Sequence, residues 1–308
     1  MLKIENLTKQ YGKLTAVDSL DLNLEPGDIM GFIGPNGAGK TTTIRIVGTL
    51  LKPTSGTAYV NGIDVTEEPE AVRPLIGYMP DFFGLYEDVT CWEFLDFFAA
   101  AYRIPRAKRK GTIDDVLELT DLTIKRENFV SELSRGMQQR LCLAKTILHD
   151  PTLLLLDEPA SGLDPRARIE IKELLKELRK MGKTILISSH ILPELADFCN
   201  KIAIIEQGKL VVSGDVGEIM DQCRVETILE IGLVDRYEEA LTMLASLDSV
   251  GEVKVEDGSI RAAYMGEPGE HYMVLTALAT NGFKVQSFTE SELDLEDIFL
   301  KVTRGAVA

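Results

Sequence analysis

One nine-residue stretch limits what this chain can fold into. Residues 34–42 read GPNGAGKTT and match the pattern G-x-x-x-x-G-K-[ST], with an apolar run before them (Ile29–Ile33) and a helix-compatible run after them (residues 42–47). A strand, a glycine-rich loop and a helix in this order bind polyphosphates, because glycines let backbone N–H groups wrap around the anion. The helix start adds partial positive charge. A chance glycine-rich turn is the alternative, and the complete pattern in this context disfavours it.

The loop pattern also assigns chemistry to two side chains. Lys40 is expected to reach the β- and γ-phosphates of a nucleotide, and the Thr41 hydroxyl is expected to ligate Mg²⁺. The residues of the loop that we expect to contact the nucleotide are Gly34, Pro35, Asn36, Gly37, Ala38, Gly39, Lys40, Thr41 and Thr42.

Two acidic residues follow an all-leucine run. Residues 153–156 predict a strand that is buried on both faces, as in a parallel sheet. Asp157 and Glu158 then emerge at its carboxyl end, where open α/β sheets bind ligands. Capping of the next helix is the ordinary role of such a pair. Beside a phosphate loop, Asp157 suits Mg²⁺ and Glu158 suits the activation of water.

Three further positions could complete a nucleotide site. Ser134 precedes a predicted helix over residues 135–149, and this helix start, which also carries Gly136, is a second place for an anion. His190 ends another apolar strand and could contact a γ-phosphate, although a lone histidine is more often structural. Tyr11 lies on a predicted turn, where its ring could stack on a nucleobase.

Composition excludes other classes of protein. The chain has 308 residues, which suggests two domains, and its net charge of -16 disfavours nucleic acid as a ligand. Its basic run, residues 103–110, is predicted to be a solvated approach to a helix, with anionic lipid as a weaker alternative. We find neither an apolar leader nor a run of the ~18 apolar residues that a spanning helix needs. The four cysteines lack metal or redox spacing, which favours a reducing compartment.

An aromatic-rich stretch covers residues 76–102, which hold nine of the chain's 20 aromatic residues. One interpretation is the core of a helical subdomain. The other is a partly exposed groove that accepts a helix of a partner, because exposed apolar patches usually mark interfaces. Both remain open.

The motifs together resemble the nucleotide-binding subunit of ATP-binding cassette (ABC) transporters over about residues 1–220. Tyr11 matches the adenine-stacking aromatic, residues 34–42 match Walker A, and Ser134 with Gly136 matches the signature motif. Asp157 matches Walker B, and Glu158 matches its catalytic glutamate. Asp164 matches the D-loop, and His190 matches the switch histidine.

Two motifs of this chain depart from the usual family pattern, and both departures point to one subfamily. The Q-loop glutamine of the family falls at Asp81, and the signature reads LSRGM where LSGGQ is usual, so that Arg135 and Met137 differ. A carboxylate can still ligate Mg²⁺ but cannot donate an amide hydrogen bond. Both departures, and the ending over residues 295–303, resemble the subfamily that energises ABC-2-type exporters.

The resemblance implies an α/β fold of the P-loop NTPase type: a mostly parallel core sheet, an antiparallel β subdomain and a helical subdomain (about residues 82–150). It implies ATP and Mg²⁺ as ligands, a head-to-tail dimer of two copies, and an integral membrane permease as partner at the cytoplasmic face of the cell membrane. Catalysis would rest on Glu158, His190 and Lys40, with Mg²⁺ on Thr41, Asp81 and Asp157. Two alternatives stay open: a soluble ABC ATPase without a transporter, and an importer subunit with a regulatory tail domain.

The composition changes at about residue 225. Residues 225–308 hold 16 acidic and 6 basic residues, and their pattern predicts the order β-α-β-β-α-β of a ferredoxin-like module, followed by a helix over about residues 294–303. We therefore expect an ABC ATPase domain over residues 1–220 and an accessory domain over residues 225–308. This accessory domain could sense a ligand, or it could brace the dimer or dock the partner subunit.

Overall fold

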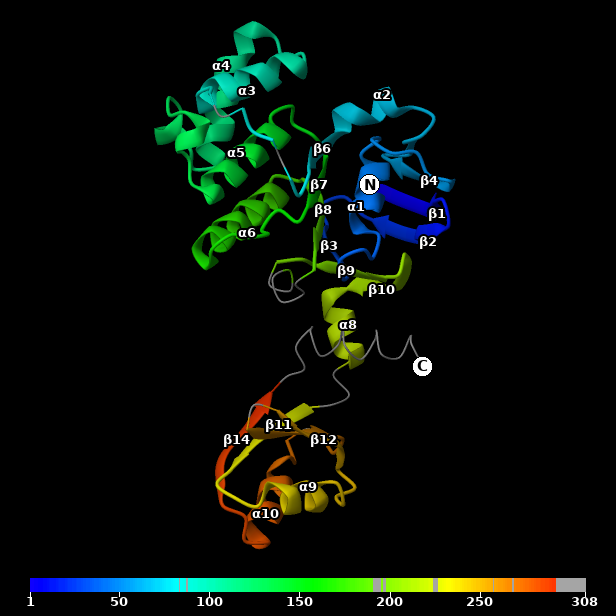
Figure 1. Cartoon of the computed structure of the whole chain (residues 1–308), viewed down its shortest axis with the longest axis vertical. Coiled ribbons are helices and arrows are strands. Elements are labelled where there is room, and N and C mark those ends of the chain that lie inside the picture. Colours follow the sequence, from blue (N-terminus) through cyan, green and yellow to red (C-terminus); the bar gives the residue numbers. More distant parts are fainter. Residues whose placement is uncertain are drawn as a thin grey trace. The chain divides into compact units, whose positions relative to one another are not determined.

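The structure is a computed structural model and describes residues 1–82, 84–86, 88–190, 195, 198–223, 227–256, 258–267 and 269–291. The chain divides into two compact units, Met1–Val216 and Gly217–Ala308 (Figure 1). Within these described residues, the first unit has two sheets and the second unit has one, and each unit has its own hydrophobic core.

A six-stranded sheet with the order β10-β9-β3-β8-β7-β6 forms the centre of the first unit. Its strands are β3 (Ile29–Ile33), β6 (Ile76–Met79), β7 (Leu153–Asp157), β8 (Thr184–Ser189), β9 (Lys201–Glu206) and β10 (Lys209–Asp215). Neighbours run parallel except β9 and β10. Every residue of β3, β7 and β8 is buried, which confirms the predicted apolar strands. Because parallel strands end at one edge, the loops after β3, β6, β7 and β8 share that edge.

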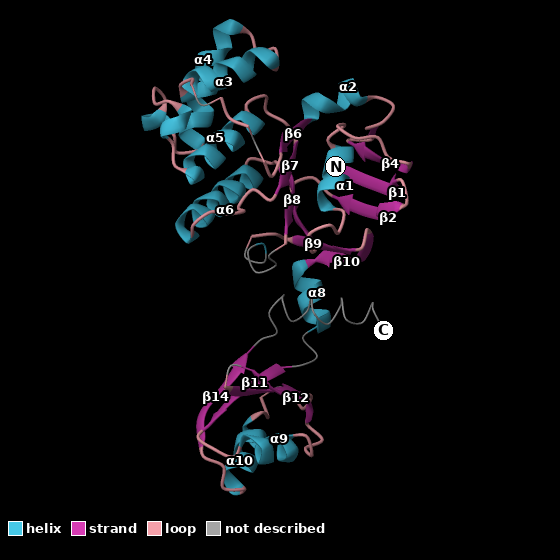
Figure 2. Cartoon of the chain, viewed as in Figure 1, coloured by secondary structure: helices cyan, strands magenta, loops and turns pink. Residues whose placement is uncertain are grey.

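An antiparallel sheet packs beside the central sheet, as predicted. Its order is β2-β1-β4-β5, with β1 (Leu2–Tyr11), β2 (Leu14–Leu24), β4 (Ser55–Val60) and β5 (Ile63–Asp64). Helix α1 (Lys40–Val47) contacts strands of both sheets (Figure 2). Leu2, Ile44 and Leu155, one from each of these three parts, belong to a single buried cluster. This cluster fixes α1, and with it the loop that precedes α1.

The other helices that the structure describes in the first unit lie on the opposite side of the central sheet from β1 and β2 (Figure 1), apart from the short α2 (Pro69–Val72). They are α3 (Cys91–Ala101), α4 (Arg106–Leu119), α5 (Arg135–Ile147) and α6 (Pro165–Lys180), with 3₁₀ turns at Arg73–Leu75, Thr123–Lys125 and Val130–Glu132. Helices α3, α4 and α5 pack on one another. Thr90 and Glu93 form a reciprocal cap at the start of α3, which fixes where this helix begins.

The start of α4 differs from the prediction. The basic run over residues 103–110 was predicted to be an approach to a helix, whereas α4 begins at Arg106, within that run. Pro105 stands directly before the helix with φ of -56°, a value already suited to a helix start. The basic run therefore forms the first turns of α4, and Arg109 lies 3.7 Å from Asp96 of α3.

The second unit confirms the predicted ferredoxin-like order. Its elements are β11 (Thr227–Leu233), α9 (Tyr237–Leu244), β12 (Val250–Glu256), β13 (Ser259–Tyr264), α10 (Tyr272–Thr280) and β14 (Val285–Ser291). The sheet order is β12-β13-β11-β14, with antiparallel neighbours. Helix α8 (Val216–Cys223), which the sequence did not predict, opens this unit. The helix expected over residues 294–303 lies outside the described residues.

None of the helices in the described ranges is long and apolar enough to cross a bilayer. Three of the four cysteines, Cys91, Cys142 and Cys199, are buried as free thiols. Burial raises the pKa of Cys91 and of Cys142 to about 11 and also raises the pKa of Cys199. These three thiols are consistent with core packing rather than with chemistry.

Candidate nucleotide-binding site

The predicted phosphate loop joins β3 to α1, and two of its glycines stand where there is no room for a side chain. Gly39 has φ of 110°, a conformation that favours glycine, and a Cβ there would collide with the carbonyl oxygen of Ala16. A Cβ at Gly34 would collide with the carbonyl oxygen of Ile205. Helix α1 starts directly after Gly39 without a cap from any described side chain. A glycine-bounded helix start of this kind suits an anion.

Lys40 lies inside this loop. Its side chain is 5% exposed, and Nζ donates to the carbonyl oxygens of Gly34 (2.6 Å) and Pro35 (3.3 Å). The same Nζ lies 3.6 Å from Oε1 of Glu158, which follows β7. The loop therefore positions one buried positive charge beside the carboxyl end of the central sheet.

The other predicted nucleotide contacts differ in exposure. Pro35, Asn36 and Gly37 are exposed, Ala38 is buried, and Thr41 and Thr42 are half-buried in the first turn of α1. Tyr11 ends β1 with 48% of its surface exposed, and Lys9 Nζ lies 5.3 Å from its ring centroid.

Glu158 lies between two basic groups. Besides its contact with Lys40, its Oε2 lies 2.8 Å from Nδ1 of His190. Glu158 also has φ of 51°, a strained conformation for a residue with a side chain. Strain of this kind persists only where the surroundings enforce it, so the fold holds this carboxylate at one place between the phosphate loop and the end of β8.

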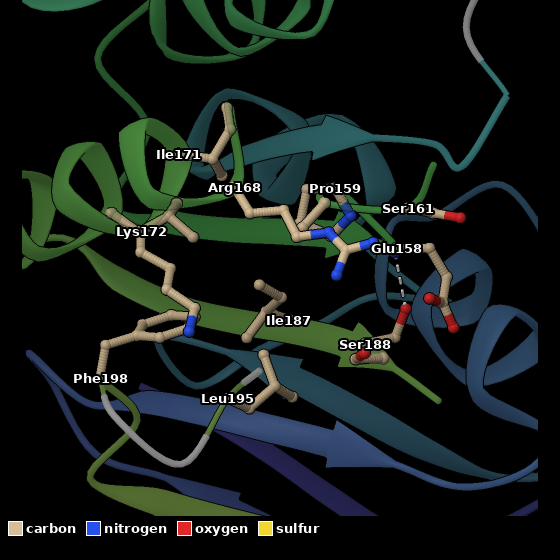
Figure 3. Close-up of a pocket in the computed structure, with 13 residues that line it drawn as sticks. Glu158, Pro159, Ser161, Arg168, Ile171, Lys172, Ile187, Ser188, Leu195 and Phe198 are labelled. Atoms are coloured by element: carbon tan, nitrogen blue, oxygen red, sulfur yellow. Dashed lines mark hydrogen bonds between the residues drawn. The ribbon is translucent and has the colours of Figure 1, made fainter. Parts of the chain in front are cut away.

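Ser188 connects the two acids, and the sequence analysis did not identify it. Asp157 is 1% exposed, and its Oδ1 accepts a hydrogen bond of 2.6 Å from Ser188 Oγ. Ser188 Oγ in turn accepts a hydrogen bond of 3.0 Å from the backbone N–H of Glu158 (Figure 3). The available signal was the position of Ser188 at the end of an apolar strand, two residues before His190.

Asp81 lies in the loop after β6, at the same edge of the sheet. Burial together with the negative charges of Asp157 and Glu158 raises the pKa of Asp81, and Arg135 and His190 partly oppose that rise. The negative charges of Asp157 and Glu158 therefore make the Asp81 carboxyl group harder to ionise.

Ser134, Gly136 and Asp164 form a second group. They line a cavity of about 550 Å³ at the starts of α5 and α6, and the lining of that cavity includes no residue of the phosphate loop. Ser134 caps α5 by accepting from Met137 N (3.3 Å), as predicted, and Asp164 caps α6 by accepting from Ala167 N (2.9 Å). The predicted site residues thus divide into a group around Lys40 and a group around Ser134.

The aromatic stretch combines features of both interpretations. Phe94 is buried and contacts Phe98 edge-on at 5.0 Å, as a core residue would. Phe82 and Phe97 are 89% and 55% exposed, respectively. Phe83 lies outside the described residues. The stretch therefore carries a buried centre and an exposed aromatic surface.

Comparisons with known proteins agree with this geometry. The sequence matches the ABC transporter family over residues 17–161. The bacitracin transport ATP-binding protein BcrA of Bacillus licheniformis is 37% identical over 307 residues, which cover 99% of this chain and 98% of that protein. The linearmycin resistance ATP-binding protein LnrL of Bacillus subtilis (strain 168) is 31% identical, with 98% of each chain covered. The chain belongs to the family of ABC transporter ATP-binding proteins.

A solved structure supports the same conclusion for the fold. The ATP-binding cassette MJ0796, in a dimeric post-hydrolysis state bound to ADP and Pi, matches with a TM-score of 0.64 and 27% identity, over 70% of this chain and 99% of that one. These findings confirm the predicted cassette fold and the predicted binding and hydrolysis of ATP.

Proposed function

We propose that two copies of this chain hydrolyse ATP between them, head to tail, and that this reaction powers export through a membrane permease. The division of the site residues into two groups supports the pairing, because a nucleotide held by the Lys40 group of one copy can be completed by the Ser134 group of the other. The dimeric MJ0796 cassette is a precedent for such a pair.

The chemistry is proposed to rest on Glu158. A carboxylate between Lys40 and His190 can accept a proton from an attacking water, and His190 can hold that carboxylate and contact the γ-phosphate. Lys40 would exchange its loop carbonyls for phosphate oxygens and neutralise the charge that develops on them. The observation that carries this proposal is the placement of Glu158 beside Lys40 and directly after the buried Asp157.

Mg²⁺ fits the available oxygen donors. The Thr41 hydroxyl and the Asp157 carboxylate are the kind of hard ligands that this ion takes, and Asp81 would supply a further carboxylate directly or through water. When bound with ATP, Mg²⁺ offsets negative charge on the β- and γ-phosphates. Because the pKa of Asp81 is raised, a bound cation would have to offset that rise by favouring the ionised form of the carboxyl group.

The remaining contacts would bind the nucleotide. Tyr11 would stack on the adenine, and residues 34–42 would surround the phosphates. From the second copy, Ser134 and Gly136 would add N–H groups at the start of α5, while Asp164 would lie beside the phosphate loop across the interface.

We propose export as the transport direction, because export of a toxic compound can confer resistance to it. Linearmycin resistance and bacitracin transport are the functions that LnrL and BcrA are named for. The exposed aromatic side chains of Phe82 and Phe97 would contact the permease, and the chain would then act at the cytoplasmic face of the membrane. Recovery with membranes only when the permease is co-expressed would support this, and recovery that ignores the permease would contradict it.

Glu158→Gln tests the catalytic assignment. The amide keeps the shape of the side chain but is a poor base, so we expect ATP binding to persist while turnover falls by a factor on the order of 10²–10⁴. Glu173→Gln is the matched control, because Glu173 is an exposed residue of α6 that pairs with Lys176. Wild-type turnover in Glu158→Gln would remove Glu158 from this role.

A further inference from the structure

Arg135 makes a contact that neither the acid pair nor the phosphate loop explains. It is the first residue of α5, and its side chain extends to the loop that follows β7, where Nη2 lies 3.4 Å from the carbonyl oxygen of Ser161. Within the described part of the chain, no carboxylate lies within ion-pair distance of its guanidinium group. The backbone of the loop is thus its partner.

Gly162, the next residue of that loop, is fitted to this contact. Its φ is 66°, and a Cβ built on it would lie 2.6 Å from Cζ of Arg135. Any larger residue would displace the guanidinium group and would also strain the turn. The arginine and the glycine therefore occupy complementary positions.

Two further contacts join the start of α5 to the same segment. Gln139 is 3% exposed, and its Nε2 donates to the carbonyl oxygen of Pro159. A Cβ at Gly136 would lie only 2.9 Å from Cβ of Ala167, in the first turn of α6. The start of α5, residues 158–163 and the start of α6 therefore pack as one unit.

Position 135 is where this unit departs from the usual signature of the family. The usual family residue there is glycine, as in LSGGQ, and glycine has no side chain that could reach Ser161. Because Arg135 is exposed, its contact is the one that a substitution can remove without opening the core.

We propose that Arg135 is a positioning residue, which holds the Ser161–Gly162 turn against the start of α5 within one copy of the chain. Ser134 directly precedes Arg135 in the sequence, and Asp164 lies two residues after Gly162. The arginine would therefore fix the positions of these two residues, which are proposed to face the other copy, relative to each other. The inference rests on the proposed head-to-tail site for its effect on turnover, but not for its effect on the loop itself.

Hydrogen exchange in the nucleotide-free protein tests the effect on the loop. The reporters are the backbone N–H groups of Ser161 and Leu163, which bond to the carbonyls of Glu158 (3.0 Å) and Ala160 (3.4 Å). Arg135→Ala is expected to speed their exchange about three- to tenfold, the equivalent of one modest hydrogen bond. Arg166→Ala is the matched control, because Arg166 lines the same cavity but pairs with Glu170 of its own helix. Equal exchange in wild type and Arg135→Ala would overturn the proposal.

A double-mutant cycle with Gly162→Ala tests the coupling to turnover. Arg135→Ala is expected to lower kcat about three- to tenfold with little change in the KM for ATP, and Arg135→Lys to restore part of the loss. If the guanidinium lies against Gly162, the added methyl group costs less turnover once Arg135 is gone. Independent, multiplicative effects of the two substitutions would overturn the proposal. An inactive wild type would instead refute the proposed ATPase site and leave the exchange result valid.

Discussion

Ser188→Ala removes the hydroxyl that joins the two acids. It deletes a 2.6 Å hydrogen bond to Asp157 and a 3.0 Å bond from the N–H of Glu158. Asp157 is 1% exposed, so water cannot readily replace the lost donor. A hydrogen bond to a charged group contributes about 1.5–3 kcal/mol and a neutral one about 1 kcal/mol. We therefore expect the free energy of unfolding of the first unit to fall by about 2–4 kcal/mol.

Urea unfolding followed by tryptophan fluorescence measures this loss. Trp92 is the only tryptophan of the chain and lies in α3, so its signal reports on the first unit alone. Thr184→Val is the control from the same strand: the Thr184 hydroxyl accepts one bond from Gly27 N (2.9 Å). The control is expected to lose about 1 kcal/mol and to keep full turnover.

Turnover should separate the two variants further. Without the hydroxyl, the backbone N–H of Glu158 loses its hydrogen bond to Ser188, so the Glu158 carboxylate can shift. A shift of about 1 Å in the catalytic base can lower the rate of ATP hydrolysis by about 100-fold. The reasoning would be refuted if Ser188→Ala lost no more stability than Thr184→Val and still hydrolysed ATP at the wild-type rate.

Two other perturbations follow from the structure. The pKa of Asp81 is raised above 3.8, so the folded chain binds its proton more tightly than the unfolded chain, and stability falls as the pH rises from 3.8 through the folded pKa. Asp81→Asn should remove that part of the fall, and an unchanged pH dependence of the urea midpoint would contradict the assignment. Phe82→Ser with Phe97→Ser should abolish copurification with a permease while leaving the ATPase activity of the isolated chain intact. Ile169→Ser, which alters another exposed apolar residue in α6, should do neither, and wild-type copurification of the phenylalanine variants would contradict the proposed surface.

The elements nearest the nucleotide site could be predicted because their signals are local. Strands β3 and β7 are short apolar runs that end at a glycine loop or an acid pair, and Ser134 carries its own cap signal. The start of α4 was missed because Arg106–Lys110 lacks the apolar periodicity of a packed helix. Only Ile113, Val116 and Leu117 of that helix are buried. Its first two turns therefore carry no large apolar side chain that could have marked the start of the helix.

The residues that hold the site could not be predicted, because pairing between distant segments decides them. Ser188 contacts Asp157 because β7 and β8 pair in parallel with these two residues as partners. A shift of one residue would place Ser189 opposite Asp157 and turn the alternating side chains to the other face of the sheet. Both serines are buried, and both follow the same apolar run, so nothing local distinguishes them. The contact of Arg135 with Gly162 depends in the same way on how α5 packs against the loop after β7.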